Sequence, residues 1–425
     1  MRIILRWFRV LMMLTPLAPA HSRADVAYTG VNLAGAEFGA TVLPGIYNTH
    51  YTYPTQTEVD YFRSKGLNTF RLCFRWERLQ QAANANFNGA EFTRFHTFVA
   101  TTTGKGMYVI LDPHNFQRYY PDPMDFQSSA QGLVGSAVPN SAFVDFWSRL
   151  ASIYKTNDHV IFNLMNEPNS MPTEQLVASE NAALAGIRSA GATNLVLVPG
   201  NGYTGAWTWG VNWYGTPNAQ AMLNIVDPGN NFAFDVHQYL DSDGSGSHTN
   251  IVSETVGLDR LVGFTSWLKT NHRKAFLGEF AVPNALVGPS ASQIGDEAIT
   301  NMLRHVQANS DVWLGWTWWA AGPWWGNYMF TLEKTSGGAD QPAMAVLRAF
   351  IPIPAPALLL KTPNQFQFQA LPGFLYQAQV ISRLDGGTWS NVGPAIVGNG
   401  QTVTTTMSVG ASVQSFYRVL VARAP

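Results

Sequence analysis

Residues 91–111, EFTRFHTFVATTTGKGMYVIL, contain the repeating unit that decides the fold. Glu91–Thr103 has the apolar spacing of an amphipathic helix, and Tyr108–Leu111 is a short apolar run typical of a buried strand. Gly104 lies between them, at a position where the end of a helix favours a residue in the left-handed conformation. The segment therefore predicts a helix that leads directly into a buried strand.

The same alternation continues from Ala27 to about Phe350. Eight apolar runs are candidate strands: Thr29–Leu33, Thr69–Leu72, Tyr108–Leu111, Val160–Met165, Leu195–Val198, Phe232–Val236, Ala275–Leu277 and Val312–Thr317. Seven helical patterns lie between or after them: Thr57–Lys65, Glu91–Thr103, Ala142–Tyr154, Thr173–Ala190, Val256–Lys269, Ile294–Val306 and Met344–Phe350. Eight strands alternating with helices predict a parallel sheet in an α/β protein, and the length favours a (β/α)8 barrel, or TIM barrel. The alternative is an open doubly wound sheet, but no G-x-G-x-x-G motif follows the first strand.

The sequence pattern changes at residues 351–356, where prolines alternate with apolar residues. Such a segment is typical of a stiff extended linker. After it, apolar residues alternate with period two, as at Phe366 and Phe368, and glycine-rich turns separate the runs. We therefore expect a barrel domain over residues 25–350, a linker over 351–356 and a small all-β sandwich-like domain over 357–425.

Residues 1–24 have the layout of a secretory signal peptide, with early arginines, an apolar run over Val10–Leu17 and small residues at two cleavage sites. Cleavage is expected after Ala20 or after Ala24. The apolar run is shorter than the roughly 20 residues that cross a bilayer, so we do not expect a membrane anchor. The sequence predicts export to the extracellular space, or to the periplasm.

Composition excludes several classes of protein. Hydrophobic residues make up 46% of the chain and charged residues 12%, the reverse of a disordered chain. A net charge of −1 gives no electrostatic case for nucleic acid or an anionic membrane as a partner. Cys73 is the single cysteine, so no intramolecular disulfide can form. The 14 tryptophans offer flat faces that suit stacking on sugar rings, or alternatively an aromatic core.

Polar residues end several of the predicted strands: Arg71, His114, Asn166, Glu167, His237, Tyr239 and Glu279. In a parallel barrel the carboxyl ends of the strands meet at one rim, where active sites of this fold are built. Two carboxylates across a cleft are what glycoside hydrolysis requires, one to protonate the leaving oxygen and one to attack the anomeric carbon or activate water. Glu167 and Glu279 are therefore the candidate pair. The alternative interpretation, two buried ion-paired carboxylates, does not explain why both fall on the same rim.

The strand ends carry recognisable motifs. Asn166-Glu167-Pro168 and Gly278-Glu279-Phe280 resemble the motifs of family 5 glycoside hydrolases. Further stretches agree with this resemblance: Asn68-Thr69-Phe70-Arg71-Leu72, Asp112-Pro113-His114-Asn115 and His237-Gln238-Tyr239. Residues 240–246 and 316–323 are similar to the endo-1,4-β-glucanase (cellulase) subgroup shared by fungi and bacteria. The resemblance covers the chain from about Gly30 to Phe350.

The resemblance implies that Glu167 is the acid/base and Glu279 the nucleophile of a retaining double displacement. It further implies supporting catalytic roles for five residues: Arg71, His114, Asn166, His237 and Tyr239. Arg71 and Tyr239 would act on the nucleophile, Asn166 on the sugar 2-hydroxyl, and His114 would line the subsite next to the cleavage point. Retention predicts carboxyl groups about 5–5.5 Å apart.

Aromatic residues near the last predicted strand are candidates for substrate binding. Trp318 or Trp319 would form the floor under a glucose ring, with the register left open. Trp324 and Trp325 would form further subsites, or would pack over the barrel rim. Asn115 is a candidate substrate contact, with orientation of its neighbour His114 as the alternative.

Two remaining motifs have plainer interpretations. Asp241–Gly246 begins like a calcium loop, but Val252 stands where the bidentate Glu should be, so no calcium site is expected. In the small domain, Trp389 and Tyr417 would stack on polysaccharide or belong to the sandwich core.

We therefore expect a secreted, monomeric, retaining endo-1,4-β-glucanase that cuts inside cellulose-type chains without a metal or cofactor. One alternative keeps the chemistry and changes the substrate to mannan, xyloglucan or mixed-linkage β-glucan. The other is a carbohydrate-binding protein without catalytic activity.

Overall fold

The computed structural model describes residues 11–12, 25–120, 132–288, 294–362, 364–385, 387–407 and 415–424. The chain divides into two compact units, the larger one consisting of Ala24–Asp60 and Leu67–Phe350, and the smaller one including Ile351–Pro425. The predicted signal peptide lies outside the described residues, apart from Leu11–Met12. Among the described helices, none combines the length and hydrophobicity that crossing a bilayer requires.

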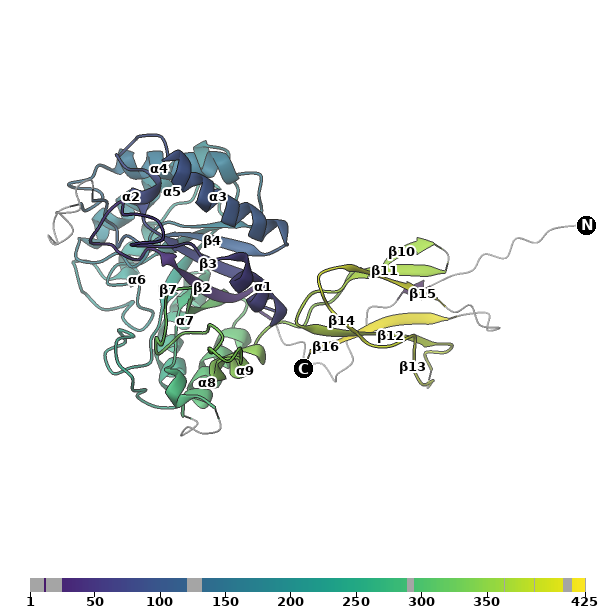
Figure 1. Ribbon diagram of the computed structural model, residues 1–425. Coiled ribbons are helices and arrows are strands. Elements are labelled where there is room, and N and C mark those ends of the chain that lie inside the picture. Colours follow the sequence, from purple (N-terminus) through teal and green to yellow (C-terminus); the bar gives the residue numbers. More distant parts are fainter. Residues whose placement is uncertain are drawn as a thin grey trace, which may run out of the picture. The chain divides into compact units, whose positions relative to one another are not determined.

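Eight strands of the larger unit close into a barrel (Figure 1). They follow chain order around it: β2 (Tyr28–Ala36), β3 (Thr69–Phe74), β4 (Tyr108–Pro113), β5 (Val160–Asn163), β6 (Val196–Pro199), β7 (Phe232–His237), β8 (Ala275–Glu279) and β9 (Trp313–Ala321). All neighbouring strands pair in parallel, and β9 closes the barrel against β2. The predicted TIM barrel is confirmed, and each of the eight candidate strands overlaps one barrel strand.

The longer helices alternate with the strands, as the pattern predicts: α1 (Gln56–Ser64), α3 (Gly89–Gly104), α4 (Asn140–Tyr154), α5 (Thr173–Ser189), α7 (Val256–Thr270), α8 (Ile294–Ala308) and α9 (Pro342–Arg348). Four short helices in the described parts of the connections were not predicted: α2 (Trp76–Leu79), α6 (Asn218–Ala221) and the 3-10 turns η2 (Met222–Asn224) and η3 (Asn284–Leu286). Each is too short to leave a periodic pattern in the sequence.

The ends of α3 illustrate how local sequence sets a helix boundary. Asn88 caps the start, because its side chain accepts a hydrogen bond from the backbone N–H of Glu91. At the other end the predicted left-handed role of Gly104 is wrong, since Gly104 is the last helical residue. The backbone N–H of Lys105 still bonds to carbonyls of the last turn, and Gly106, with φ of 77°, takes the left-handed conformation.

The interior of the barrel changes from apolar to polar along the strands. Five buried residues form an apolar layer: Ile110, Ile161, Leu197, Ala233 and Phe276. Side chains two residues apart in a strand point to the same face, so the next inward positions are Asp112, Asn163 and Asp235, all fully buried. The polar layer therefore lies directly below the carboxyl rim and supports the site built there.

The described strands of the smaller unit form two sheets. One has the strand order β1-β16-β12-β13, with β14 also pairing with β12, and the other has the order β10-β11-β15. Their bounds are β1 (Leu11–Met12), β10 (Leu359–Thr362), β11 (Gln365–Gln369), β12 (Phe374–Ile381), β13 (Ser390–Asn391), β14 (Ile396–Val397), β15 (Thr402–Thr406) and β16 (Phe416–Arg423). Strands after residue 357 pair antiparallel, and Phe366 of one sheet packs against Tyr417 of the other at 6.1 Å. The predicted all-β C-terminal part is confirmed, with buried Tyr417 in its core and half-buried Trp389 under the Arg418 guanidinium.

Candidate active site

Arg71 of β3 is the central cation of the polar layer and is fully buried. Its Nη1 donates hydrogen bonds to Asn32 and to Glu279 Oε1, each at 2.8 Å. Its Nη2 donates to Asp112 at 2.9 Å and to Asn166 at 2.7 Å. Burial opposes the charge, but the Asp112 and Glu279 carboxylates outweigh it and raise the pKa of Arg71. The guanidinium stays charged and fixes the side chains around it.

Glu279 ends β8, and both of its carboxylate oxygens accept hydrogen bonds. Oε1 accepts from Arg71, and Oε2 accepts from the Tyr239 hydroxyl at 2.7 Å. Burial and then the Glu279 carboxylate hold the pKa of Tyr239 well above its usual value, so its hydroxyl keeps the proton that it donates. Glu279 therefore has a fixed orientation at the bottom of the rim.

Glu167 follows β5 and faces Glu279. Its backbone has a φ of 44°, its side chain is partly exposed, and its Oε1 lies 2.7 Å from His237 Nδ1. A carboxylate oxygen of Glu167, a ring nitrogen of His237 and a carboxylate oxygen of Glu279 all lie within 4.8 Å of one another. The structure thus brings the two predicted acidic residues together across a gap of a few ångströms.

His237 lies between the two acidic residues. Burial disfavours its charge, but Glu279, Asp235 and Glu167 outweigh burial and raise the pKa of His237 to about 10. Carboxylates face both ring nitrogens, which favours the cationic imidazole. This set of residues acts as a hydrogen-bonded group with an internal cation.

Two other clusters contain side chains that could ligate a metal, one around Asp112 and one around Asp241. In both, the carboxylate is hydrogen-bonded to other groups of the protein. Asp112 bonds to Arg71 and to His114, while Cys73 lies buried beside them. In the segment that begins like a calcium loop, the Asp241 carboxylate accepts hydrogen bonds from backbone N–H groups of the same loop, including those of Gly246 and Ser247. These bonds account for both carboxylates through the folding of the chain alone.

His114 and Trp319 form one wall of the site. The His114 ring lies 5.5 Å from the Trp319 ring with only 19° between their planes, so the two stack. Its Nδ1 lies 2.9 Å from Asp112, and its Nε2 lies 3.1 Å from the Asn166 side-chain nitrogen. Burial alone would raise the pKa of Asp112, but Arg71 and His114 lower it. Contacts at both ring nitrogens therefore fix the orientation of the His114 ring beside Asn166.

Solvent exposure distinguishes the two candidate tryptophans, Trp318 and Trp319. Trp318 is fully buried and donates to the carbonyl of Phe330, so its predicted contact with substrate is wrong. Trp319 is partly exposed and donates from its indole N–H to the Tyr328 hydroxyl at 3.1 Å. Neighbouring residues of β9 point to opposite faces, so only one of the pair can face the site.

The remaining predicted aromatic residues differ in their surroundings. Trp325 is partly exposed, stacks on Tyr328 at 4.1 Å and contacts Trp319 edge-on at 5.9 Å. Trp324 is 42% exposed. Trp325 therefore extends the wall formed by Trp319, while Trp324 presents a free aromatic surface next to it.

The predicted contact of Asn115 with substrate is wrong. Asn115 is fully buried, its side-chain N–H groups donate to both oxygens of Glu77, and its oxygen accepts from the backbone of Trp76. It joins the loop after β4 to the short helix α2, which the sequence pattern does not predict.

Sequence reasoning also missed residues that the structure brings to the site. Asp235 lies 3.5 Å from His237 Nε2, and Asn32 accepts from Arg71. Both are polar interruptions of apolar strands, which is the same signal that identified Arg71. Two exposed aromatics, Tyr203 and Trp207, lie in the loop after β6; backbone N–H groups at Tyr203 and Ala206 bond to Pro168 and His237, so the loop borders Glu167.

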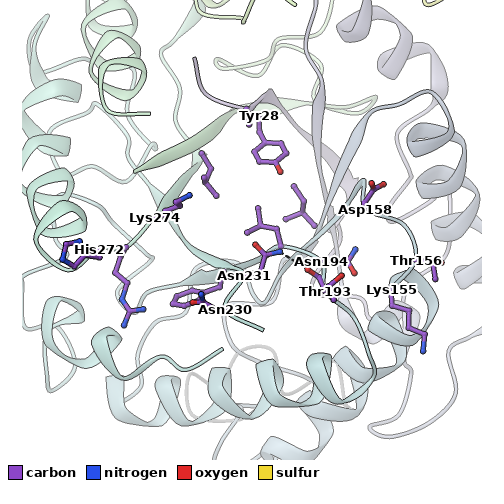
Figure 2. Close-up of a pocket in the computed structure, with 16 residues that line it drawn as sticks. Tyr28, Lys155, Thr156, Asp158, Thr193, Asn194, Asn230, Asn231, His272 and Lys274 are labelled. Carbon is purple, nitrogen blue, oxygen red and sulfur yellow. Dashed lines mark hydrogen bonds between the residues drawn. The ribbon is translucent and has the colours of Figure 1, made fainter. Parts of the chain in front are cut away.

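A cavity of about 800 Å³ lies at the other end of the barrel (Figure 2). Figure 2 shows Tyr28 on one side of it and Asn194 and Asn231 on the other, all from the amino ends of strands or the loops before them. None of the predicted site residues lines it, and it does not belong to the candidate active site.

A barrel rim with two facing carboxyl groups has the arrangement that acid–base cleavage of a glycosidic bond requires. The comparison with known proteins agrees, and the protein is a glycoside hydrolase. The model of the cellulase family, glycosyl hydrolase family 5, matches residues 25–322. The chain belongs to this family, as the resemblance predicts.

Individual relatives support the same assignment. Endoglucanase gh5-1 of Neurospora crassa is 39% identical over 326 residues, which cover 76% of this chain and 77% of the relative. Endo-beta-1,4-glucanase B of Emericella nidulans is 38% identical over 330 residues, covering 77% and 93%. The crystal structure of an endo-beta-1,4-glucanase from Xanthomonas axonopodis pv. citri is 41% identical with a TM-score of 0.71, covering 77% of this chain and 98% of that chain.

Proposed function

We propose that the protein is a retaining endo-β-1,4-glucanase in which Glu167 is the acid/base and Glu279 the nucleophile. The observation that carries this proposal is the separation of the two carboxylates, whose nearest described oxygens lie within 4.8 Å. Retaining enzymes hold the pair about 5–5.5 Å apart, whereas inverting enzymes need about 6.5–9.5 Å to admit a water molecule. The close pair supports retention.

The reaction would proceed in two displacements. Glu279 attacks the anomeric carbon while Glu167 gives its proton to the leaving glycosidic oxygen, which yields a covalent glycosyl-enzyme and frees the shortened chain. Glu167, now ionised, takes a proton from water as the water attacks the same carbon and the bond to Glu279 breaks. Two inversions restore the starting configuration, and both carboxyl groups regain their initial protonation.

The surrounding residues support these two roles. Arg71 and Tyr239 orient the two oxygens of Glu279, and His237 orients Glu167. Asn166, held by Arg71 and His114, is proposed to bond the sugar 2-hydroxyl. Bonds to this hydroxyl strengthen in the transition state.

Aromatic surfaces on two sides of the carboxyl pair favour a polymeric substrate. The wall formed by Trp319 and Trp325 lies on the His114 side, and exposed Tyr203 and Trp207 lie in the loop that borders Glu167. Stacking positions on both sides suit a chain that is cut internally. A β-1,4-glucan is the proposed substrate because the relatives are named for this activity.

Several sequence-based assignments remain part of the proposal. Residues 1–24 are proposed to be removed as a signal peptide, so that the mature enzyme acts outside the cytoplasm as a monomer. Residues 25–350 would form the catalytic domain, joined by the linker 351–356 to the small domain 357–425.

The test compares wild type, Glu279→Gln and the exposed control Glu254→Gln on carboxymethylcellulose, following both viscosity and reducing ends. Wild type and the control should lower viscosity rapidly, while Glu279→Gln should lose at least about 10³-fold activity because the nucleophile is gone. Proton NMR of the first product should show the β-anomer. The α-anomer would reject retention, and faster hydrolysis of mannan, xyloglucan or mixed-linkage glucan would reject the substrate.

A further inference from the structure

Three carboxylates surround the His237 imidazole. Its Nδ1 lies 2.7 Å from Glu167 and 3.5 Å from Glu279, and its Nε2 lies 3.5 Å from Asp235. Asp235 and His237 belong to β7, Glu279 to β8 and Glu167 to the segment after β5, and all four side chains except that of Glu167 are almost completely buried. The protonation state of His237 therefore depends on the combined charge of these three carboxylates.

In the reaction proposed above, two of these three carboxylates change their charge. Glu167 is neutral before the first displacement and ionised after it. Glu279 is ionised at first and becomes a neutral ester in the glycosyl-enzyme. Asp235 takes no part in either bond change, so it is the one carboxylate of the three with a constant charge.

The surroundings of Asp235 are built for an ion pair with His237. Neither Asp235 oxygen has a hydrogen-bond partner among the described residues, and the same holds for His237 Nε2. Within 4 Å, the cations that face Asp235 in the described chain are His237 and, at 3.9 Å, Arg71. Gly278 provides the space, because a Cβ there would lie 2.2 Å from Asp235 Oδ1.

Arg71 does not neutralise Asp235 alone. Its two terminal nitrogens already bond to Glu279 and Asp112 at 2.8 and 2.9 Å, which are much shorter than its 3.9 Å approach to Asp235. The neighbouring Tyr239 hydroxyl is uncharged, since burial and Glu279 hold its pKa well above the usual value. A cationic His237 is thus the charge that balances Asp235.

We propose that Asp235 is a positioning residue that keeps His237 doubly protonated, and its Nδ1–H directed at Glu167, through both displacements. The inference rests on the proposed function, because the acid/base residue must be held in place in both of its charge states. Carboxylates face both ring nitrogens, so His237 can donate from Nδ1 to Glu167 while Nε2–H faces Asp235 only if both nitrogens carry a proton.

The test replaces one oxygen of the carboxylate in Asp235→Asn, which removes the charge and retains the shape. Imidazole ¹H–¹⁵N NMR of the whole protein follows His237. Wild type should stay doubly protonated beyond pH 8, and the midpoint of the variant should fall by about 1–3 pH units. The kcat/KM of the variant should fall at least about tenfold at pH 8, with a smaller loss at pH 5.5 and a KM within about threefold of wild type.

Asn163→Ala is the matched control, because Asn163 lies in the same polar layer and bonds to Asp112 rather than to His237. It should leave the His237 titration unchanged even if it lowers stability. An unchanged titration in Asp235→Asn would overturn the inference. If that variant does not fold, a wild-type His237 that titrates near pH 6.5 would overturn it equally. The NMR readout requires no substrate, so a failed glucanase assay would reject the proposed function and leave this result interpretable.

Discussion

Replacing Arg71 by Met should cost the barrel a large part of its stability. Met has a similar length and fills the space, but it donates no hydrogen bond. The change would leave Asp112 and Glu279 without the cation that now lies 2.8–2.9 Å from each of them. Removing one partner of a buried ion pair costs about 3–5 kcal/mol. With about 2–3 °C for each kcal/mol in a domain of this size, the melting temperature should fall by roughly 6–15 °C.

Differential scanning calorimetry measures this loss, and Lys269→Met provides the matched control. Lys269 pairs with Asp311 at 3.6 Å, and both side chains are about half exposed or more. Exposed pairs contribute about 0–1 kcal/mol, so the control should shift the melting temperature by no more than about 3 °C. An Arg71→Met shift no larger than that of the control would refute the argument that Arg71 neutralises the buried carboxylates.

Three further outcomes follow from the site and its surroundings. Tyr239→Phe removes the 2.7 Å bond to Glu279, so kcat/KM on a soluble cello-oligosaccharide should fall about 10–100-fold; a change below twofold would show that this bond contributes little. The pKa of His237 is raised from 6.5 to about 10, so its contribution to stability is complete below pH 6.5 and is lost as the pH rises toward 10. The melting temperature of His237→Asn should therefore fall less between pH 7 and 10 than that of wild type, and parallel curves would contradict this. Burial holds the pKa of Glu180 well above its usual value, and neither carboxylate oxygen is hydrogen-bonded in the described chain. Folding therefore requires protonation of Glu180, and the free-energy cost of that protonation grows as the pH rises above 4.5. Glu180→Leu should raise the melting temperature more at pH 8 than at pH 5, and an equal rise at both pH values would argue against a buried acid.

The barrel could be predicted because each strand and helix leaves its own period in the sequence. The rim residues were visible because polar side chains such as Arg71 and Glu279 interrupt or end runs that are otherwise apolar. This signal depends only on neighbours in the chain. It requires no knowledge of which distant strand lies alongside.

Features that depend on exact register or distant partners could not be predicted. The pairing of β9 with both neighbouring strands contains a register shift, and one such shift exchanges the faces of all following residues. Trp318 and Trp319 could therefore not be distinguished. Asn115 was misassigned because its partner, Glu77, lies 38 residues away in a helix of four residues. Asp235 interrupts β7 as Arg71 interrupts β3, but the sequence alone does not show that its carboxylate faces His237.

The hydrogen bonds of Asn32 link the beginning of the barrel to its end. Its side-chain N–H groups reach the carbonyls of Gly278 and Trp318, 246 and 286 residues later in the chain, while its oxygen accepts from Arg71. A ribosome delivers these partners in order, so a nascent chain holds Asn32 long before the carbonyls of Gly278 and Trp318 exist, and Arg71 long before Glu279 exists. Premature termination anywhere before β8 leaves a product with no Glu279 and no closed seam. Closure of the barrel and the pairing of Arg71 with Glu279 therefore both require the last two strands of the barrel to be synthesised.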